Sequence, residues 1–175
     1  NYAINESHEP GSTFKLVDLI AVLDDKKADT STVYDSRGGQ IQYYKSWVRD
    51  SHEGGYGKIS LARGFEVSSN TVLVQSVFNN YKNNPKQFVD RIRSYGLHKP
   101  LGLPIKGEGR TYIPYPGTSG WSGTSLPWMA FGYGLMVTPL QTLTLYNAVA
   151  NNGVMVKPIF VSEVKEWNKT IKKFN

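Results

Sequence analysis

The first pair of residues in this sequence that could perform chemistry is a serine followed three positions later by a lysine. Ser12 and Lys15 follow the turn-forming dipeptide Pro10-Gly11 and precede an apolar run over residues 16–23. Because these apolar residues recur at helical spacing, we expect Ser12 in the first turn of a helix with Lys15 on the same face. The unpaired N–H groups of a helix start favour negative charge on Ser12, and a desolvated lysine can accept the serine proton. The pair predicts a nucleophile and its general base.

This short motif has an ordinary structural alternative. Ser12 would then be a helix N-cap and Lys15 a solvated side chain in the first turn. A second copy at Ser162 and Lys165 lies in an alternating apolar stretch that predicts extended chain, without a helix start before it. The tetrapeptide alone favours the structural interpretation, so other residues must decide.

The composition narrows the classes of protein to consider. The 175 residues are 39% hydrophobic and 13% aromatic, which suits one globular domain with a single core. No apolar run approaches the roughly 20 residues of a membrane span. The sequence has no cysteine, which excludes disulfides, zinc–thiolate sites and cysteine nucleophiles. The net charge of +6 is modest, and no basic stripe interleaved with aromatic residues is present, so we expect no nucleic-acid binding.

The elements that must position these residues are predicted to be mainly helical. Helices are expected over residues 12–23, 58–67, 69–81, 84–96 and 138–152. The polar segment 24–57 predicts a loop with short strands near 40–44. The segment 103–126 predicts a long loop of the kind that is often functional. Residues 154–174 predict one or two strands with a turn near Asn168.

A second candidate pair, Ser68 and Asn70, lies at the junction of two of these predicted helices. A serine hydroxyl can relay a proton, and an asparagine amide can both donate and accept hydrogen bonds towards a substrate amide. Helix capping by Ser68 or Ser69 is the structural alternative. On its own, this pair again favours the structural interpretation.

The two motifs taken together, and the segments around them, resemble a known family. Ser-x-x-Lys and Ser-x-Asn belong to the signature of class A β-lactamases and penicillin-binding proteins. Residues 9–15 (EPGSTFK) and 65–71 (FEVSSNT) resemble the corresponding segments of class B high-molecular-weight penicillin-binding proteins. Residues 130–141 (AFGYGLMVTPLQ) are similar to their glycine-rich strand and threonine–proline helix start, and residues 151–158 (NNGVMVKP) to the turn that follows. The resemblance is strongest to the septal, cell-division branch.

The resemblance implies a peptidoglycan D,D-transpeptidase and a role for each residue. Ser12 would attack the D-Ala-D-Ala peptide bond and become acylated, with Lys15 as general base. Ser68 would pass the proton to the leaving D-alanine, and Asn70 would orient Lys15 and the donor peptide. Ser68, Asn70 and Tyr133 would bind substrate, although Tyr133 could equally belong to a tight packing turn.

The resemblance also implies partners and a location. Peptidoglycan stem peptides would be the substrates, β-lactam antibiotics would acylate Ser12 by mimicking them, and divisome membrane proteins would be partners. The protein would be periplasmic, at the extracytoplasmic face of the inner membrane, anchored by a segment outside this chain. No metal or cofactor is implied.

The family's third motif, Lys-Thr-Gly, does not occur, and the nearest string, Lys169-Thr170-Ile171, has isoleucine in place of the glycine. The resemblance therefore implies that residues 1–175 are a partial transpeptidase domain, running from the Ser-x-x-Lys segment to just before the expected Lys-Thr-Gly. The fold class expected is mainly α with a small β portion, namely the helical subdomain of the penicillin-binding/serine β-lactamase-like transpeptidase fold with its central sheet largely missing. Because loss of one oxyanion-hole donor costs about 10²–10³ in rate, we expect this chain alone to be nearly inert.

Three alternatives remain open. A serine β-lactamase would need a deacylating carboxylate on a loop after Ser-x-Asn, where Glu108 lies in a sequence unlike that enzyme's. A non-catalytic β-lactam sensor or peptidoglycan-binding module would acylate without turnover. A Ser-His-Asp hydrolase using His8, His52 or His98 lacks a supporting elbow motif, and the His-Glu pairs lack metal-ligand spacing.

Overall fold

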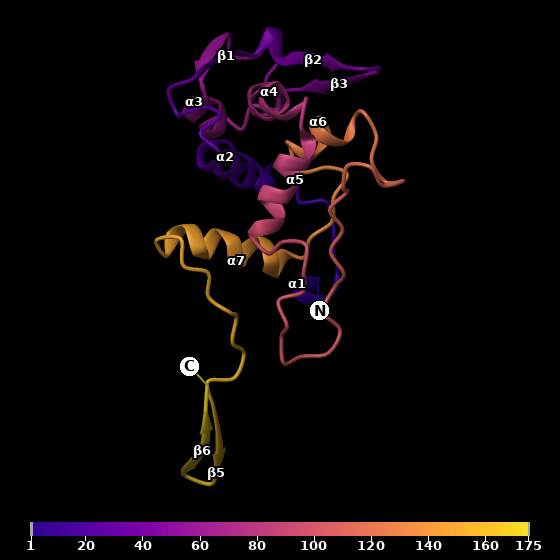
Figure 1. Ribbon diagram of the computed structural model, residues 1–175. Helices are drawn as coiled ribbons and strands as arrows, with labels where there is room; N and C mark the ends of the chain where they lie inside the picture. The colour runs from indigo at the N-terminus through magenta and orange to yellow at the C-terminus, as the bar shows by residue number, and fades with distance from the viewer. Residues whose placement is uncertain (1, 175) are drawn as a thin grey trace.

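Helix α4, Asn70–Tyr81, forms the centre of the structure, a computed structural model that describes residues 2–174 (Figure 1). The sequence places valine, leucine and small polar residues on nearly every side of this helix, and eight of its twelve residues are buried. A helix that is apolar all round belongs in a core. Four helices pack against it: α2 (Lys15–Asp24), α3 (Leu61–Glu66), α5 (Pro85–Ser94) and α6 (Ser125–Met129).

Local capping chemistry explains where the helices begin. The Ser69 side chain accepts a hydrogen bond from Val72 N at the start of α4, and Pro85 occupies the first turn of α5. Helix α7, Pro139–Ala150, starts with a capping box between Thr138 and Gln141. The predicted helices at 12–23, 69–81, 84–96 and 138–152 are thus confirmed, the first being preceded by a 3-10 turn, η1, Gly11–Phe14.

One predicted helix is wrong at its start, and two short helices were not predicted. Residues Lys58–Ser60 form strand β4, and the helix predicted over 58–67 begins only at Leu61, with Ser60 as its N-cap. The strand forms because β4 pairs with β1, Val33–Asp35, which is distant in sequence. Helices α1 (Tyr2–Asn5) and α6 are too short to show an apolar period.

The strands of residues 2–174 form three separate antiparallel pairs. Besides β1–β4, strand β2 (Gln40–Tyr43) pairs with β3 (Ser46–Arg49) after a 3-10 turn, η2, Arg37–Gly39. Strands β5 (Glu163–Glu166) and β6 (Lys169–Lys173) form a hairpin that projects from the helices at the far end of the molecule (Figure 1). The predicted strands near 40–44 and around Asn168 are confirmed, and Ser162 lies outside any helix, as predicted.

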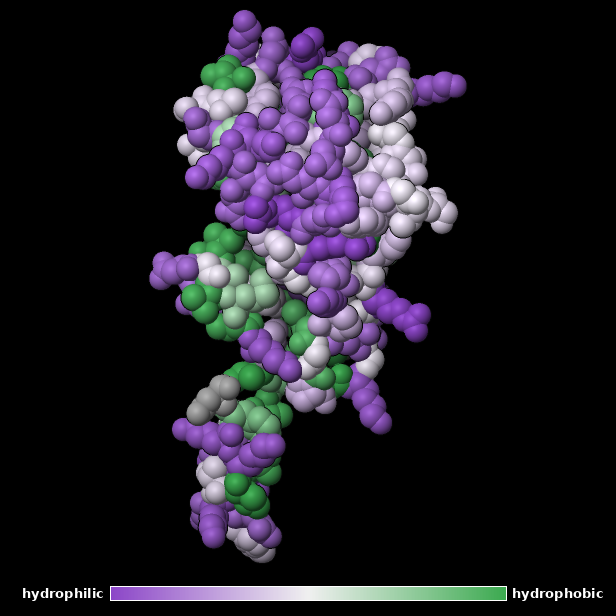
Figure 2. Space-filling model, viewed as in Figure 1, coloured by the Kyte–Doolittle hydropathy of each residue, from purple (hydrophilic) through white to green (hydrophobic). Residues whose placement is uncertain are grey.

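Hydrophobic residues are exposed along α7 and the segment that leads to the hairpin, where Figure 2 shows them gathered on the lower part of the molecule. They include Leu143, Val149, Val154, Ile159 and Val161. The buried core lies instead around α4, and it contains two ionisable side chains, Lys15 and Asp18. Within residues 2–174, no helix has the length and apolar character required to cross a membrane.

Candidate active site

Ser12 and Lys15 lie on the continuous helical segment formed by η1 and α2. Ser12 is exposed in η1, and Lys15, the first residue of α2, is only 1% exposed. Gly11, just before Ser12, has a φ of +56°, in the left-handed region that glycine adopts without steric cost. The expected helix start is therefore present, and the alternative of a solvated Lys15 is wrong because the side chain is buried.

The buried Lys15 ammonium is held by a single residue of the second motif. Lys15 Nζ donates to the Ser68 carbonyl oxygen at 2.6 Å and lies 2.9 Å from Ser68 Oγ. Between α3 and α4, Ser68 adopts a φ of +55°, a conformation that costs a non-glycine residue about 1–3 kcal/mol. Backbone hydrogen bonds from Ser68 N to Phe65 O and from Ser69 N to Gly64 O hold this junction in place. The fold thus joins Ser-x-x-Lys and Ser-x-Asn in one network.

The environment of Lys15 favours its neutral form. Burial lowers the pKa of Lys15 to about 8, although the nearby carboxylates of Asp50 and Asp18 act in the opposite direction. At pH 7 about one tenth of Lys15 is then neutral, compared with well below one hundredth for an ordinary lysine. A lysine in this state is suited to accept a proton from a serine hydroxyl.

Asp50, which the sequence analysis did not single out, ties the second motif to the loop after β3. Its carboxylate accepts hydrogen bonds from Thr71 N at 2.9 Å, Thr71 Oγ1 at 2.8 Å and Ser69 Oγ at 3.1 Å. The neighbouring Asn70 amide donates to the Arg49 carbonyl oxygen at 2.6 Å. Asn70 therefore lies beside the network with its amide held by Arg49, and its orientation of Lys15 stays a prediction.

A tight turn places Tyr133 next to the nucleophile segment. Gly11 N donates to Gly132 O at 3.0 Å, and Gly134 N donates to Glu9 Oε1 at 2.8 Å, so the chain is tied on both sides of Tyr133. Gly132 has a φ of +84°, and a Cβ there would collide with the Gly11 carbonyl. The Tyr133 side chain is 42% exposed. Both predicted roles are compatible with this geometry, because a packed turn presents an exposed ring beside Ser12.

Glu108 does not have the surroundings of a catalytic base. Its carboxylate accepts hydrogen bonds from three successive backbone N–H groups, those of Leu101, Gly102 (3.0 Å) and Leu103 (3.2 Å). These bonds close the loop on which Glu108 lies. The carboxylate that the β-lactamase alternative requires is thus engaged in shaping the backbone.

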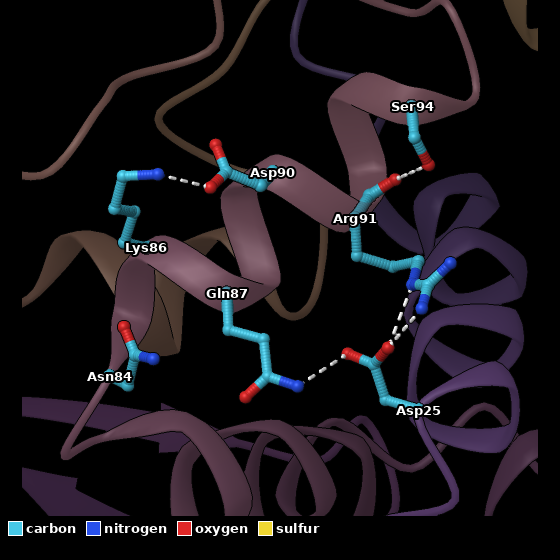
Figure 3. A pocket seen from close by; sticks show the side chains of 7 residues that line it. All are labelled: Asp25, Asn84, Lys86, Gln87, Asp90, Arg91 and Ser94. Atoms are coloured by element: carbon cyan, nitrogen blue, oxygen red, sulfur yellow. Dashed lines mark hydrogen bonds and ion pairs between the residues drawn. The ribbon is translucent and has the colours of Figure 1, made fainter.

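A separate polar pocket lies between α2 and α5 (Figure 3). Its charged side chains pair with one another: Arg91 Nε donates to Asp25 at 2.8 Å, and Lys86 lies 2.5 Å from Asp90. Tyr81 OH also donates to Asp25, at 2.8 Å. The charged side chains of this pocket thus have partners within it or next to it. Nor do residues 2–174 contain a cluster of histidine and acidic side chains that could hold a metal ion.

Comparison with known proteins agrees with this geometry. The sequence profile of the penicillin-binding protein transpeptidase domain matches residues 1–175. Penicillin-binding protein PbpB of Mycobacterium tuberculosis is 31% identical over 158 residues, which are 90% of this chain and 22% of that protein. The peptidoglycan D,D-transpeptidase FtsI of Escherichia coli is 27% identical over 164 residues, which are 94% of this chain and 26% of that protein.

Solved structures agree as well. Penicillin-binding protein 3 of Mycobacterium tuberculosis, crystallised with aztreonam, matches with a TM-score of 0.78 and 29% identity, over 93% of this chain and 35% of that chain. The chain spans about a quarter of the length of the curated relatives described above. With both motifs joined at Lys15 and the profile matched from end to end, this chain belongs to the penicillin-binding protein transpeptidase family.

Proposed function

We propose that the protein to which this chain belongs is a peptidoglycan D,D-transpeptidase that forms an acyl-enzyme on Ser12. The observation that carries the proposal is the contact of buried Lys15 with Ser68, with the exposed Ser12 three residues before Lys15 in η1. The transpeptidase family and the name of the Escherichia coli relative support the same activity.

Ser12, Lys15 and Ser68 have separate roles in the proposed acylation step. Lys15 Nζ accepts the proton of Ser12 Oγ as this oxygen bonds to the carbonyl carbon of the penultimate D-alanine. When the peptide C–N bond breaks, the proton passes from Lys15 through Ser68 Oγ to the departing D-alanine amine. The amine of a second stem peptide then attacks the ester, and Ser12 regains its proton. Asn70 and Tyr133 bind the donor peptide.

β-Lactams are proposed to acylate Ser12 by the same first step, as expected for a relative of a protein crystallised with aztreonam. The β-lactamase alternative has no support here, because Glu108 is bonded to backbone N–H groups. No observation favours the sensor or peptidoglycan-binding alternative over the enzyme.

We further infer that residues 1–175 are the helical part of a larger transpeptidase domain whose central sheet and Lys-Thr-Gly strand come from other residues. Two observations support this: residues 2–174 contain only two-stranded sheets, and the chain covers 35% of its solved relative. The protein is proposed to act on the extracytoplasmic side of the inner membrane, where its substrate is, anchored by a segment outside this chain and with divisome membrane proteins as partners.

The test is to incubate the full-length protein with labelled penicillin and to locate the adduct by intact-mass analysis and peptide mapping. One adduct on Ser12 is expected, and none in Ser12→Ala. Ser162→Ala, in the second copy of the motif, is the matched control and should label fully. Absence of an adduct in the wild type, or an adduct elsewhere, contradicts the proposal.

The same samples separate the alternatives. A stable adduct with cross-linking of stem peptides supports the transpeptidase, whereas rapid release of hydrolysed penicillin indicates a β-lactamase, and a stable adduct without cross-linking indicates a sensor. The chain of residues 1–175 alone should acylate about 10²–10³ times more slowly, because one oxyanion-hole donor is expected outside it. Equal rates would overturn the inference of an incomplete site.

A further inference from the structure

Asp18, on α2, is a buried carboxyl group that the proposed mechanism does not use. Its side chain is 0% exposed, and neither carboxylate oxygen has a hydrogen-bond partner within residues 2–174. Its helical neighbours Val17, Ala21 and Val22 are packed into the apolar core. Buried polar groups are normally hydrogen-bonded, and an unpaired carboxylate in a core is among the most costly groups a fold can hold. Such a residue calls for a functional explanation.

The position of Asp18 relative to Lys15 provides one. The two residues are three positions apart on α2, so their side chains share a face of the helix. Lys15 directs its ammonium group to Ser68, and Asp18 lies in the interior one turn further on. Opposite charges in a core of low dielectric attract each other more strongly than they would at the surface.

The other ionisable groups around α2 have hydrogen bonds, ion pairs or ring contacts of their own. Asp50, which faces Lys15 from the loop after β3, accepts hydrogen bonds from Ser69 and Thr71, and its charge raises the pKa of Lys15 more than the charge of Asp18 does. On the elements packed against α2 within residues 2–174, the remaining ionisable groups have interaction partners other than Asp18, although Arg93 Nε is buried without a hydrogen bond. Tyr81 and Arg91 bond to Asp25, Lys86 pairs with Asp90, Arg63 pairs with Glu66, and Arg93 stacks on Tyr115.

We propose that Asp18 is a positioning residue for the lysine base, whose carboxylate stabilises the ammonium charge that Lys15 acquires when it accepts the Ser12 proton. The inference rests on the proposed function for its catalytic meaning. The directions of titration agree: burial raises the pKa of Asp18 well above its usual range, Lys15 lowers it, and Asp18 in turn raises the pKa of Lys15. Asp18 thus opposes the effect of burial on the pKa of Lys15.

The test is an NMR titration of Lys15 in the full-length protein, with ¹³C-labelled lysine and Lys15→Arg to assign the signal. In Asp18→Asn the pKa of Lys15 should fall by about one pH unit, because an adjacent opposite charge is lost. Asp18→Ser should do the same, so the test does not depend on one variant folding well. The matched control is Asp24→Asn, which removes an exposed carboxylate from the same helix and should leave Lys15 unchanged.

An unchanged titration of Lys15 in both Asp18 variants, or an equal fall in Asp24→Asn, overturns the inference. This readout does not require activity, so it fails or succeeds separately from the transpeptidase proposal. In the full-length protein, the rate of Ser12 acylation by penicillin can be measured as a function of pH. The acidic limb of this pH–rate profile should shift to lower pH by the same amount in Asp18→Asn. If the acidic limb of the pH–rate profile does not shift although the pKa of Lys15 does, Lys15 is not the base.

Discussion

Helix α2 has a buried carboxylate in its middle and another just after its C-terminal end, and their surroundings are opposite. Asp25 accepts hydrogen bonds from Arg91 and Gln87 of α5 (Figure 3) and from Tyr81 of α4. Asp18 accepts none within residues 2–174, although it is fully buried. Burial alone therefore does not indicate the role of an acid in this fold. The fully bonded carboxylate serves stability, and the unbonded one is free to respond to the charge on Lys15.

The largest effect should come from removing the base while keeping its charge. Lys15→Arg should lower the rate of Ser12 acylation in the full-length protein by about 10²–10⁴-fold, because arginine stays protonated and cannot take the serine proton. Stopped-flow or quenched labelling with penicillin measures this rate. Lys82→Arg, at an exposed position after α4, is the control. If Lys15→Arg retains the wild-type rate, Lys15 is not the base and the functional role proposed for Asp18 has no basis.

Next in size is the loss of the bonded carboxylate. Asp25→Ala should lower the free energy of unfolding by about 2–3 kcal/mol, since the Arg91 guanidinium and the buried Tyr81 hydroxyl lose an acceptor. Urea denaturation measures this change. Asp24→Ala, which removes one exposed hydrogen bond from Tyr95, should cost about 0.5–1 kcal/mol, the lower part of the usual range for a hydrogen bond. Equal losses in the two variants would contradict the structural role assigned to Asp25.

The unbonded carboxylate should behave in the opposite way and depend on pH. The pKa of Asp18 is raised in the folded state, so its ionisation destabilises the fold; the penalty is absent below the unfolded pKa and grows as pH rises towards the folded pKa. Asp18→Asn should therefore gain stability over the wild type above about pH 4, by at most about 1.4 kcal/mol per pH unit. Urea denaturation at a series of pH values tests this. A difference that does not vary with pH would show that Asp18 is not ionised there.

The smallest effect is expected at Glu9, a bonded carboxylate close to the site. Glu9→Gln keeps an oxygen that can accept from Gly134 N and loses only the charge, so acylation should fall about two- to tenfold. Glu9→Ala removes the acceptor and should fall further, because the turn that carries Tyr133 is released. A larger loss in Glu9→Gln than in Glu9→Ala would mean that the charge of Glu9, rather than its bond to Gly134, matters.

The sequence predicted the parts of this structure whose causes are local. Pro85 and the Thr138–Gln141 capping box fix helix starts within a few residues, and α5 and α7 were predicted correctly. Strand β4 was missed because its partner β1 lies far back along the chain. Long-range pairing of this kind leaves little trace in a local hydrophobic pattern.

The same distinction holds at the candidate site. Ser12, Lys15, Ser68 and Asn70 were found from motif spacing, and the structure brings Lys15 and Ser68 into contact across more than fifty residues. The sequence gives no sign of the role of Asp50. Its partners Ser69 and Thr71 lie on another element, and only folding brings them to Asp50. Helical spacing could have placed Asp18 on the face of Lys15, but only the packed structure shows that its carboxylate has no hydrogen bond from the described residues, 2–174.

The central claim is that buried Lys15, held by Ser68, activates Ser12, and the pH dependence of acylation in the full-length wild type tests it most directly. A base must be neutral to act, so the rate of Ser12 labelling by penicillin should rise with pH and level off above about pH 8, following the pKa of Lys15. The midpoint should match the NMR titration of Lys15 in the same protein. A rate that is flat between pH 6 and 9, or a midpoint apart from that of Lys15, would contradict the claim.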